Sequence, residues 1–109
     1  MPAIHITEAE SVILEALWRL GPLPPMRLIA EVQSVRPWGA ATIKTLLGRL
    51  KHKKAVRSER ADGVLRYRAL IERAAYVEGE VTSLVDRLFA GDAAALIALL
   101  SAREEPAQA

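Results

Sequence analysis

Residues 42–50 have the sequence TIKTLLGRL, and this segment shows the clearest helical period in the 109-residue chain. Its four aliphatic residues recur at i, i+3, i+4 and i+7, so they share one face of a helix. They are Ile43, Leu46, Leu47 and Leu50. The opposite side contains small, hydroxylic and basic residues but no acidic one: Thr42, Lys44, Thr45, Gly48, Arg49, Lys51 and His52. The spacing therefore predicts a helix from about Gly39 to His52 or Lys54, buried on one side and cationic on the other.

Two further helices are expected before this segment. Thr7 and Glu10 have the spacing of a capping box, in which a hydroxyl and a carboxylate satisfy free backbone N–H groups at the start of a helix. The helix that begins at Thr7 ends at Gly21-Pro22, which does not continue helical geometry. Pro25 suits the first turn of a second helix. That helix ends before Pro37, because the residue preceding a proline is disfavoured in helical geometry.

After residue 54 the sequence changes to the alternating period of β-strands. Val56–Arg60 and Leu65–Ala69 are predicted as two short strands. Asp62-Gly63 lies between them, and this dipeptide tolerates the positive φ angles of a tight hairpin turn. In the second strand the apolar residues at alternate positions face one side, and Arg66 and Arg68 face the other. We therefore expect a hairpin with an arginine-bearing face.

Two more helices are expected at the C-terminal end, over residues 72–90 and 92–102. Gly91 suits a left-handed helix end, and Asp92 suits the cap of the next helix. The sequence AAALIALL at residues 93–100 is apolar around nearly its whole circumference, which an exposed helix in a soluble monomer is not. Either these helices pack back on the preceding domain, or they form a two-fold dimer interface. We favour the dimer and assign these residues to it: Val81, Leu84, Val85, Leu88, Phe89, Leu96, Ile97 and Leu100.

The composition excludes several classes of function. Cysteine is absent, which excludes disulfides, thiolate metal sites and cysteine nucleophiles. His5 and His52 are far apart, and neither a HExxH motif nor a glycine-rich phosphate loop occurs. We therefore expect no enzyme, no metal site and no cofactor. The N-terminus does not resemble a signal peptide and no apolar run is long enough to span a bilayer, so we expect a cytoplasmic protein without membrane insertion.

The order of three helices followed by a hairpin is typical of a winged helix-turn-helix, in which the third helix enters the DNA major groove. The expected fold is mainly α with a small β-hairpin wing, with a DNA-binding domain over residues 1–71 and a helical dimerisation region over 72–109. The charge distribution agrees with this. The net charge is +2 for the whole chain but +8 between Arg36 and Arg68. This window contains ten basic residues and only two acidic ones, Glu59 and Asp62. Lysines and arginines in that window would neutralise phosphates.

Candidate DNA contacts follow from the positions on the third helix and the wing. Thr42, Thr45 and Arg49 share an outer face and are assigned to base edges. Six of the other basic residues are assigned to phosphates: Lys44, Lys51, Lys53, Arg57, Arg66 and Arg68. The alternative for the run at residues 51–54 is a solvated helix end that complements the helix dipole.

Several segments resemble the penicillinase and methicillin-resistance repressor family (BlaI/MecI type), to which the CopY repressors are related. The resemblance covers nearly the whole chain: ITEAE at residues 6–10, Leu17-Trp18, Trp38, TIKTLLGRL at 42–50, Tyr67, Leu70 and DRLFAG at 86–91. It implies a homodimeric repressor with an N-terminal winged helix and a C-terminal dimerisation domain that binds palindromic operators. It also implies that a membrane-bound sensor metalloprotease can trigger release by cleaving the repressor.

The chain departs from the family pattern at three places. Residues 39–42 are Gly-Ala-Ala-Thr where family members have Ser-Pro-Lys-Thr, so one basic contact is missing at Ala41. Lys54 stands where the family has a glycine, and we expect it to lose the left-handed cap and alter the approach to the wing. The family's Asn-Phe cleavage bond corresponds to Ala98-Leu99, so cleavage by a conventional sensor protease is not expected.

The sequence thus favours a homodimeric, DNA-binding transcriptional repressor that blocks promoters by occupying them. An alternative is a winged-helix protein-interaction module or antirepressor that forms mixed dimers with a longer homologue. Alanine at position 41 and the short segment after Ser101 motivate this alternative.

Overall fold

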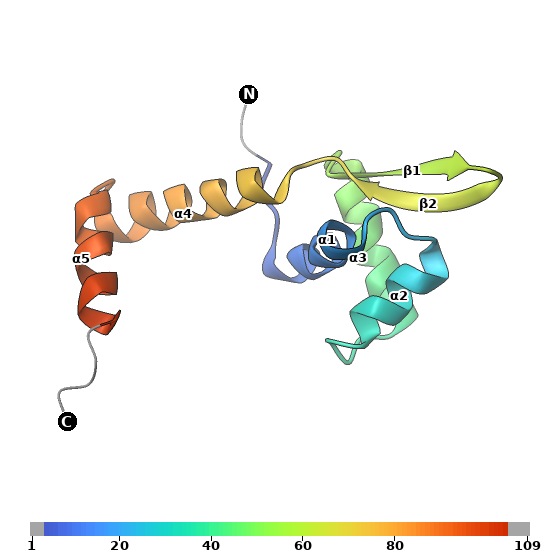
Figure 1. Ribbon diagram of the computed structural model, residues 1–109, viewed down its shortest axis with the longest axis horizontal. Coiled ribbons are helices and arrows are strands. Elements are labelled where there is room, and N and C mark those ends of the chain that lie inside the picture. The colour runs from blue at the N-terminus through green and yellow to red at the C-terminus, as the bar shows by residue number, and fades with distance from the viewer. Residues whose placement is uncertain (1–3, 105–109) are drawn as a thin grey trace. The chain divides into compact units, whose positions relative to one another are not determined.

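Five helices and one two-stranded hairpin make up residues 4–104, the part of the chain that the computed structural model describes (Figure 1). The elements are α1 (Glu8–Leu20), α2 (Pro25–Gln33), α3 (Ala40–His52), β1 (Val56–Ala61), β2 (Val64–Ala69), α4 (Arg73–Phe89) and α5 (Ala93–Glu104). They divide into two compact units, the first of which ends at Arg73 and the second of which begins at Ala74.

Both ends of α1 and the start of α2 confirm the signals in the sequence. Thr7 caps α1: its hydroxyl accepts from the Glu10 N–H at 3.1 Å, and the Glu10 carboxylate accepts from the Thr7 N–H at 2.9 Å. Gly21 ends α1 at φ 82°, a left-handed angle that suits glycine. Pro25 is the first residue of α2, where its missing N–H costs no hydrogen bond.

The core of the first unit lies between α1, α2 and α3. The predicted stripe of α3 is buried throughout, and it meets buried residues of the other two helices and of the segment that enters the hairpin. The buried apolar side chains of this unit are Ile6, Ile13, Leu14, Ala16, Leu17, Leu23, Leu28, Val32, Ile43, Leu46, Leu47, Leu50, Ala55 and Val56. Removing these side chains from water is the main term that holds α3 in place and leaves its other side in solvent.

The hairpin closes through a two-residue turn. Asp62 and Gly63 have φ angles of 53° and 77°, as predicted for Asp-Gly, and the strands are each one residue longer than expected. The antiparallel register pairs Arg57 with Arg68 and Ser58 with Tyr67. Since directly paired residues share a face, Arg57 and Arg68 lie on one face and Tyr67 lies on the other.

Two long-range contacts that the sequence did not indicate attach the hairpin to the helices. The connector between α1 and α2 pairs with β2, because Leu23 and Tyr67 exchange both backbone hydrogen bonds, at 3.1 and 2.8 Å. After β2, the indole Nε1–H of Trp18 donates to the Ile71 carbonyl at 2.8 Å. The wing is therefore fixed to the helical core at its base.

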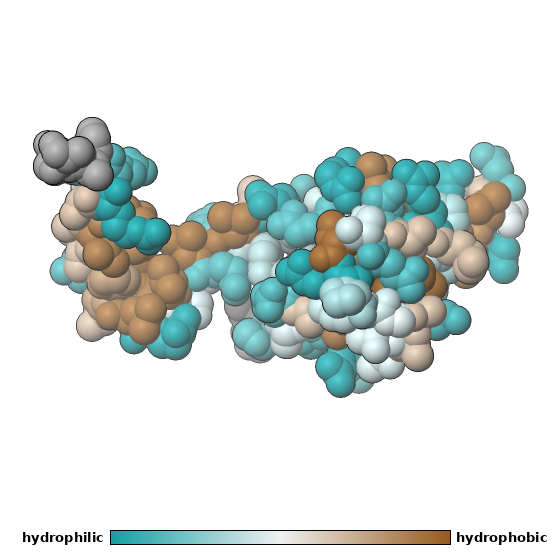
Figure 2. Space-filling model, turned by 90° about the horizontal axis from the view of Figure 1, so that it is seen from below, coloured by the Kyte–Doolittle hydropathy of each residue, from teal (hydrophilic) through white to brown (hydrophobic). Residues whose placement is uncertain are grey.

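The second unit contains α4 from Ala74 onward and all of α5. Ala90 and Gly91 both have left-handed φ angles, and the Gly91 N–H donates to the Val85 carbonyl at 3.1 Å. The Asp92 carboxylate then caps α5 by accepting from the Ala95 N–H at 3.3 Å. Val85 is the only buried residue among those described in α4, and α5 has none. Much of the apolar surface of this unit is therefore exposed (Figure 2).

Candidate nucleic-acid interface

The outer side of α3 is exposed along its whole length. Helical geometry places Thr45, Gly48 and His52 opposite the buried stripe. Thr42 and Arg49 lie on one flank of this outer side, and Lys44 and Lys51 lie on the other. All the predicted contact residues of this helix are exposed: Thr42, Lys44, Thr45, Arg49 and Lys51. The Thr45 hydroxyl donates to the Ala41 carbonyl at 3.0 Å, which leaves its oxygen free to accept. The described part of the chain provides no carboxylate partner for the cations on this side.

The wing has a charged face that includes a carboxylate among its arginines. Glu59 binds Arg68 through three contacts, with Arg68 Nε at 3.0 and 3.1 Å from the two carboxylate oxygens and Nη2 at 3.0 Å. Arg57 Nη2 lies 3.2 Å from the same carboxylate. The hydrogen bonds from Arg68 are the main cause that lowers the pKa of Glu59. Arg66 lies on the same face, directly opposite Glu59 in the register.

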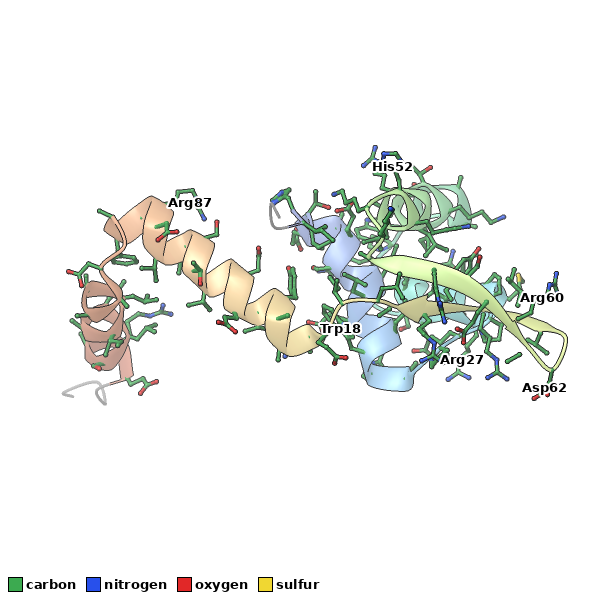
Figure 3. All side chains as sticks on the ribbon, turned by 90° about the horizontal axis from the view of Figure 1, so that it is seen from above. Trp18, Arg27, His52, Arg60, Asp62 and Arg87 are labelled. Carbon is green, nitrogen blue, oxygen red and sulfur yellow. The ribbon has the colours of Figure 1, made fainter. Side chains whose placement is uncertain are left out.

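The tip of the wing differs from this face. Arg60 pairs with Leu65 and so lies on the other face of the hairpin. Its Nη1 donates to the Gly63 carbonyl at 3.2 Å, which closes the turn. Arg60 and Asp62 both lie toward the end of the hairpin (Figure 3). The predicted contacts Arg57, Arg66 and Arg68 are thus together on one face, and Arg60 is separate from them.

Lys53 lies in an internal ion pair rather than with the other predicted phosphate contacts. Its Nζ lies 2.6 Å from a Glu10 carboxylate oxygen and 2.8 Å from the His5 carbonyl. Burial by itself raises the pKa of Glu10, but the hydrogen bonds from Lys53 and from the Thr7 N–H outweigh it and hold the pKa below its usual range. Glu10 is fully buried, so the pair joins the start of α1 to the end of α3. Sequence spacing did not indicate this pair because 43 residues separate its members.

The expectation that Lys54 loses the left-handed cap of α3 is wrong. Lys54 has a φ of 62°, and its N–H donates to the Lys51 carbonyl at 3.0 Å. The Ala55 N–H donates to the Leu50 carbonyl at 2.9 Å. These two bonds make a Schellman motif, which satisfies free carbonyls at the helix end. The tertiary contacts of Ala55 and Lys53 therefore hold a lysine in a conformation that usually favours glycine.

A groove of about 260 Å³ runs between α2, α3 and β2, on the lysine side of α3. It is lined by Pro25, Ile29, Lys44, Leu47, Gly48, Lys51 and Tyr67. The Lys51 ammonium lies 5.8 Å from the centre of the Tyr67 ring, a cation–π distance. The lining thus combines an apolar floor with two cations and no carboxylate.

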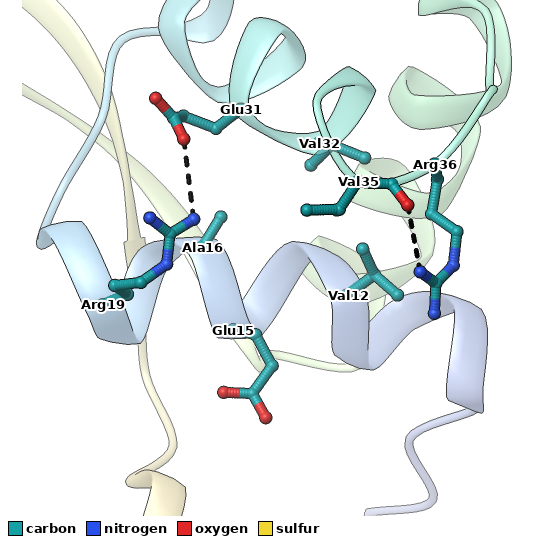
Figure 4. Close-up of a pocket in the computed structure, with 8 residues that line it drawn as sticks. All are labelled: Val12, Glu15, Ala16, Arg19, Glu31, Val32, Val35 and Arg36. Carbon is teal, nitrogen blue, oxygen red and sulfur yellow. Dashed lines mark hydrogen bonds and ion pairs between the residues drawn. The ribbon is translucent and has the colours of Figure 1, made fainter.

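A second groove, of about 230 Å³ between α1 and α2, has a different charge (Figure 4). Its lining includes Glu15 and Glu31 as well as Arg19 and Arg36, and Arg19 lies 3.5 Å from Glu31. Because carboxylates balance the cations, this groove does not suit a polyanion. The cationic groove beside α3 therefore differs in kind from this one.

The predicted dimerisation residues fall into two groups in the second unit. Val85 is buried within the single chain, and Leu84, Phe89 and Leu96 are partly covered. The others are exposed, with 60% of Leu88 and 62% of Ile97 accessible to solvent. The exposed apolar residues of this unit are Val77, Val81, Leu88, Ile97, Leu99 and Leu100.

Comparison with known sequences decides the family. The sequence model of the penicillinase repressor family matches residues 6–109. The chain belongs to the penicillinase repressor family. This confirms the resemblance based on the segments at residues 6–10, 42–50 and 86–91.

Two curated relatives of this chain are longer than the chain itself. A penicillinase repressor from Bacillus licheniformis is 26% identical over 87 residues, which are 80% of this chain and 68% of that protein. An uncharacterised 16.5 kDa protein in the ptsI 3′ region of Latilactobacillus sakei is 32% identical over 84 residues, 77% of this chain and 58% of that protein. The chain thus spans less than two thirds of the second relative.

Solved structures confirm the winged-helix fold. The solution structure of the DNA-binding domain of the repressor BlaI is 27% identical, with a TM-score of 0.60, and the match covers 70% of this chain and 94% of that one. The solution structure of the Bacillus licheniformis BlaI monomeric form in complex with the blaP half-operator is also 27% identical, with a TM-score of 0.62. The match again covers 70% of this chain and 94% of that one. A MarR family protein from Bacillus stearothermophilus, 19% identical with a TM-score of 0.53, agrees in fold. The penicillinase repressor family and its solved BlaI neighbours are DNA-binding repressors, not enzymes.

Residues 4–104 contain neither a membrane-spanning helix nor a cluster of metal-ligating side chains. No helix in this range is both long enough and apolar enough to span a membrane. The same range contains no group of three or more histidine, cysteine, aspartate or glutamate residues placed to hold a metal ion.

Proposed function

We propose that this chain is a transcriptional repressor that binds operator DNA through α3 and the wing and represses by occupying the promoter. The observation that supports this most is the outer side of α3, which is exposed, cationic and free of carboxylates. A helix with such a side in a winged-helix domain suits the major groove, where phosphates flank the base edges. The matching BlaI structure was solved in complex with a half-operator, which supports operator DNA as the partner of this chain.

The residues of α3 divide into two proposed roles. Thr42, Thr45 and Arg49 contact base edges, because their exposed donors and acceptors lie on the central and one lateral part of the outer side. Arg49 has the strongest potential for specificity, since a guanidinium binds the O6 and N7 atoms of guanine together. Lys44 and Lys51 bind phosphates as flexible point charges.

The wing contributes phosphate contacts from its charged face. Arg66 is available, and Arg57 and Arg68 reach phosphates by exchanging the Glu59 carboxylate for a phosphate oxygen. Lys53 is assigned to its pair with Glu10 and is left out of the proposed contacts, because its ammonium is 2.6 Å from a buried carboxylate. Breaking that pair for a phosphate would leave Glu10 charged and unpaired in the core.

The second unit is proposed to form a homodimer on palindromic operators. Its exposed apolar residues on α4 and α5 are the kind of surface that a second copy covers. Dimerisation also suits the function, because two recognition helices on one assembly bind two half-sites with a high effective concentration. A two-fold dimer therefore predicts a two-fold symmetric operator.

Release by a conventional sensor protease is not part of this proposal. Ala98 and Leu99 occupy the position of the family's cleavage bond and lie within α5, where both are exposed. Neither residue matches the Asn-Phe pair at which repressors of the resembled family are cleaved.

Selection from random duplex DNA tests the proposed function. The full chain is incubated with the random pool at low salt, and bound duplexes are amplified and sequenced. We expect an enriched, two-fold symmetric motif that binds at least about 1,000-fold tighter than a scrambled duplex. No binding to any duplex at low salt would contradict the proposal and favour the protein-interaction module.

A further inference from the structure

Gly48 is the one glycine in α3, and the chain's own packing gives no reason for it. It lies in the interior of the helix, where glycine is less favourable than alanine. A Cβ atom built at Gly48 meets no heavy atom within 4 Å, and the φ angle of Gly48 is not in the left-handed range. Neither crowding by neighbouring atoms nor the backbone conformation therefore requires glycine at position 48 in the free chain.

The surroundings of Gly48 indicate what approaches it. Gly48 lines the groove of about 260 Å³ together with Lys44, one turn before it, and Lys51, nearly one turn after it. The two lysines are about 10 Å apart along the helix axis, at a rise of about 1.5 Å per residue. The groove thus has a cation on each side of its glycine and no carboxylate in its lining.

The floor and wall of this groove suit a sugar–phosphate strand. Leu47 is buried beneath the groove, and the partly exposed Pro25 and Ile29 of α2 complete an apolar floor. A deoxyribose presents a largely apolar face, and the phosphates on either side of it are anionic. Tyr67 closes the groove toward the wing and holds the Lys51 ammonium over its ring at 5.8 Å. Along the groove an apolar floor lies between two cations, which complements an apolar sugar face between two anionic phosphates.

We infer that Gly48 is the point where one DNA strand comes closest to α3, with a deoxyribose on the apolar floor and the adjacent phosphates bound by Lys44 and Lys51. This inference rests on the proposed function, since it requires DNA on the outer side of α3. The inference adds Gly48 to the proposed contact residues. Because Gly48 has no side chain, it sets how deeply α3 enters the major groove of the DNA.

Gly79 in α4 provides a matched control. It is also an interior helical glycine, and a Cβ atom there meets nothing within 4 Å. Its neighbours in sequence are Glu78 and Glu80, so its surroundings are acidic. Replacing either glycine by alanine or leucine favours helix formation to the same extent. Only Gly48 lies in the proposed strand path.

The experiment compares Gly48→Ala, Gly48→Leu, Gly79→Ala and Gly79→Leu in the full chain. Circular dichroism and thermal melts establish that each variant folds, and fluorescence anisotropy with the duplex enriched from the random pool gives Kd. We expect Gly48→Ala to weaken binding about fivefold and Gly48→Leu at least about 50-fold, since the added atoms must displace the strand. Both Gly79 variants are expected to bind within about twofold of the original chain.

The two possible failures are distinguishable. If the original chain binds no DNA, the proposed function fails before any variant is compared. If it binds and a folded Gly48→Leu variant binds within about twofold of it, the close approach at Gly48 is contradicted. Lys44→Gln and Lys51→Gln test the phosphate contacts: each is expected to reduce the slope of log Kd against log salt by about one. An unchanged slope in both variants would overturn that part of the inference.

Discussion

At the scale of single residues, the pair of Glu10 and Lys53 has the clearest structural consequence. Glu10 is fully buried, and one of its oxygens is 2.6 Å from the Lys53 ammonium. Its other oxygen has no hydrogen-bond partner among the described residues. The carboxylate already caps α1 through the Thr7 N–H, so one side chain both starts the first helix and fixes the end of the third.

Glu10→Gln is expected to lower the free energy of unfolding by about 2 kcal/mol at pH 7, less than for a fully buried pair because Lys53 retains some access to water. The pKa of Glu10 is lowered in the folded state, so its stabilisation is present above the unfolded pKa, near 4.5, and is lost as the pH falls through the folded pKa. Urea denaturation at pH 7 and pH 3 measures this.

Glu8→Gln is the control, because Glu8 is exposed and its nearest cation, on Arg36, is 3.4 Å away. We expect this variant to change stability by less than about 0.5 kcal/mol. A Glu10→Gln variant as stable as the original chain at pH 7 would show that the pair does not hold the helices together.

Arg49 and Lys51 are expected to affect DNA binding in different ways. Arg49→Ala removes a proposed base contact, so it weakens the selected duplex by about 1–3 kcal/mol and relaxes the preference at one base pair. Lys51→Ala removes a phosphate contact, so it weakens all duplexes alike and reduces the salt slope by about one. Titrations of both variants against the selected duplex and its single-base variants separate these effects. Equal loss on every duplex for Arg49→Ala would contradict its assignment to a base edge.

At the scale of secondary-structure elements, the wing carries a carboxylate that we expect to compete with DNA for its arginines. The Glu59 carboxylate lies 3.0 Å from Arg68 and 3.2 Å from Arg57, and hydrogen bonds from these arginines lower its pKa. The arginines must leave this carboxylate to reach phosphates. We therefore expect Glu59 to lower the affinity of the wing for DNA.

Glu59→Gln is expected to raise affinity for any duplex about threefold to tenfold at low salt, because it adds one net positive charge and frees two arginines. The gain should shrink at high salt. Anisotropy titrations at two salt concentrations, on selected and scrambled duplexes, measure both effects. Weaker binding by Glu59→Gln would indicate that the carboxylate instead orients the arginines for DNA.

The elements were largely predictable from sequence because their signals are local. The capping box at Thr7, the Asp62-Gly63 turn and the i, i+3, i+4 pattern of α3 each depend on a few adjacent residues, and all three are confirmed. The contacts that were missed join distant segments. Nothing local indicates that Leu23 pairs with Tyr67, or that Lys53 binds Glu10.

The candidate site was predictable only in part for the same reason. The period of α3 placed its exposed side correctly, but membership of the cationic groove depends on α2 and β2, which supply Pro25, Ile29 and Tyr67. In the sequence, the charge of Glu59 is only a minor offset to the ten basic residues between Arg36 and Arg68. Its three contacts with Arg68 became visible only with the strand register.

At the scale of the whole molecule, the second unit is expected to join two copies of the chain. Leu88→Glu places a charge on the exposed apolar stripe of α4 and is expected to raise the dimer dissociation constant at least about 100-fold, because that charge would lose water without gaining a partner. Ser83→Glu adds the same charge on the other side of α4 and is expected to have little effect. Sedimentation equilibrium measures both variants. A monomeric original chain at 100-fold its DNA Kd would rule out the proposed dimer.

Binding of DNA by the outer side of α3 and the charged face of the wing is best tested by NMR. The ¹⁵N-labelled full chain is titrated with the selected duplex, and amide shifts are followed along the sequence. We predict that the largest changes fall in residues 40–52 and 57–68, and that the buried segment of α1 around residues 13–17 changes little. Large shifts confined to residues 74–104, with α3 and the wing unchanged, would contradict the proposed interface.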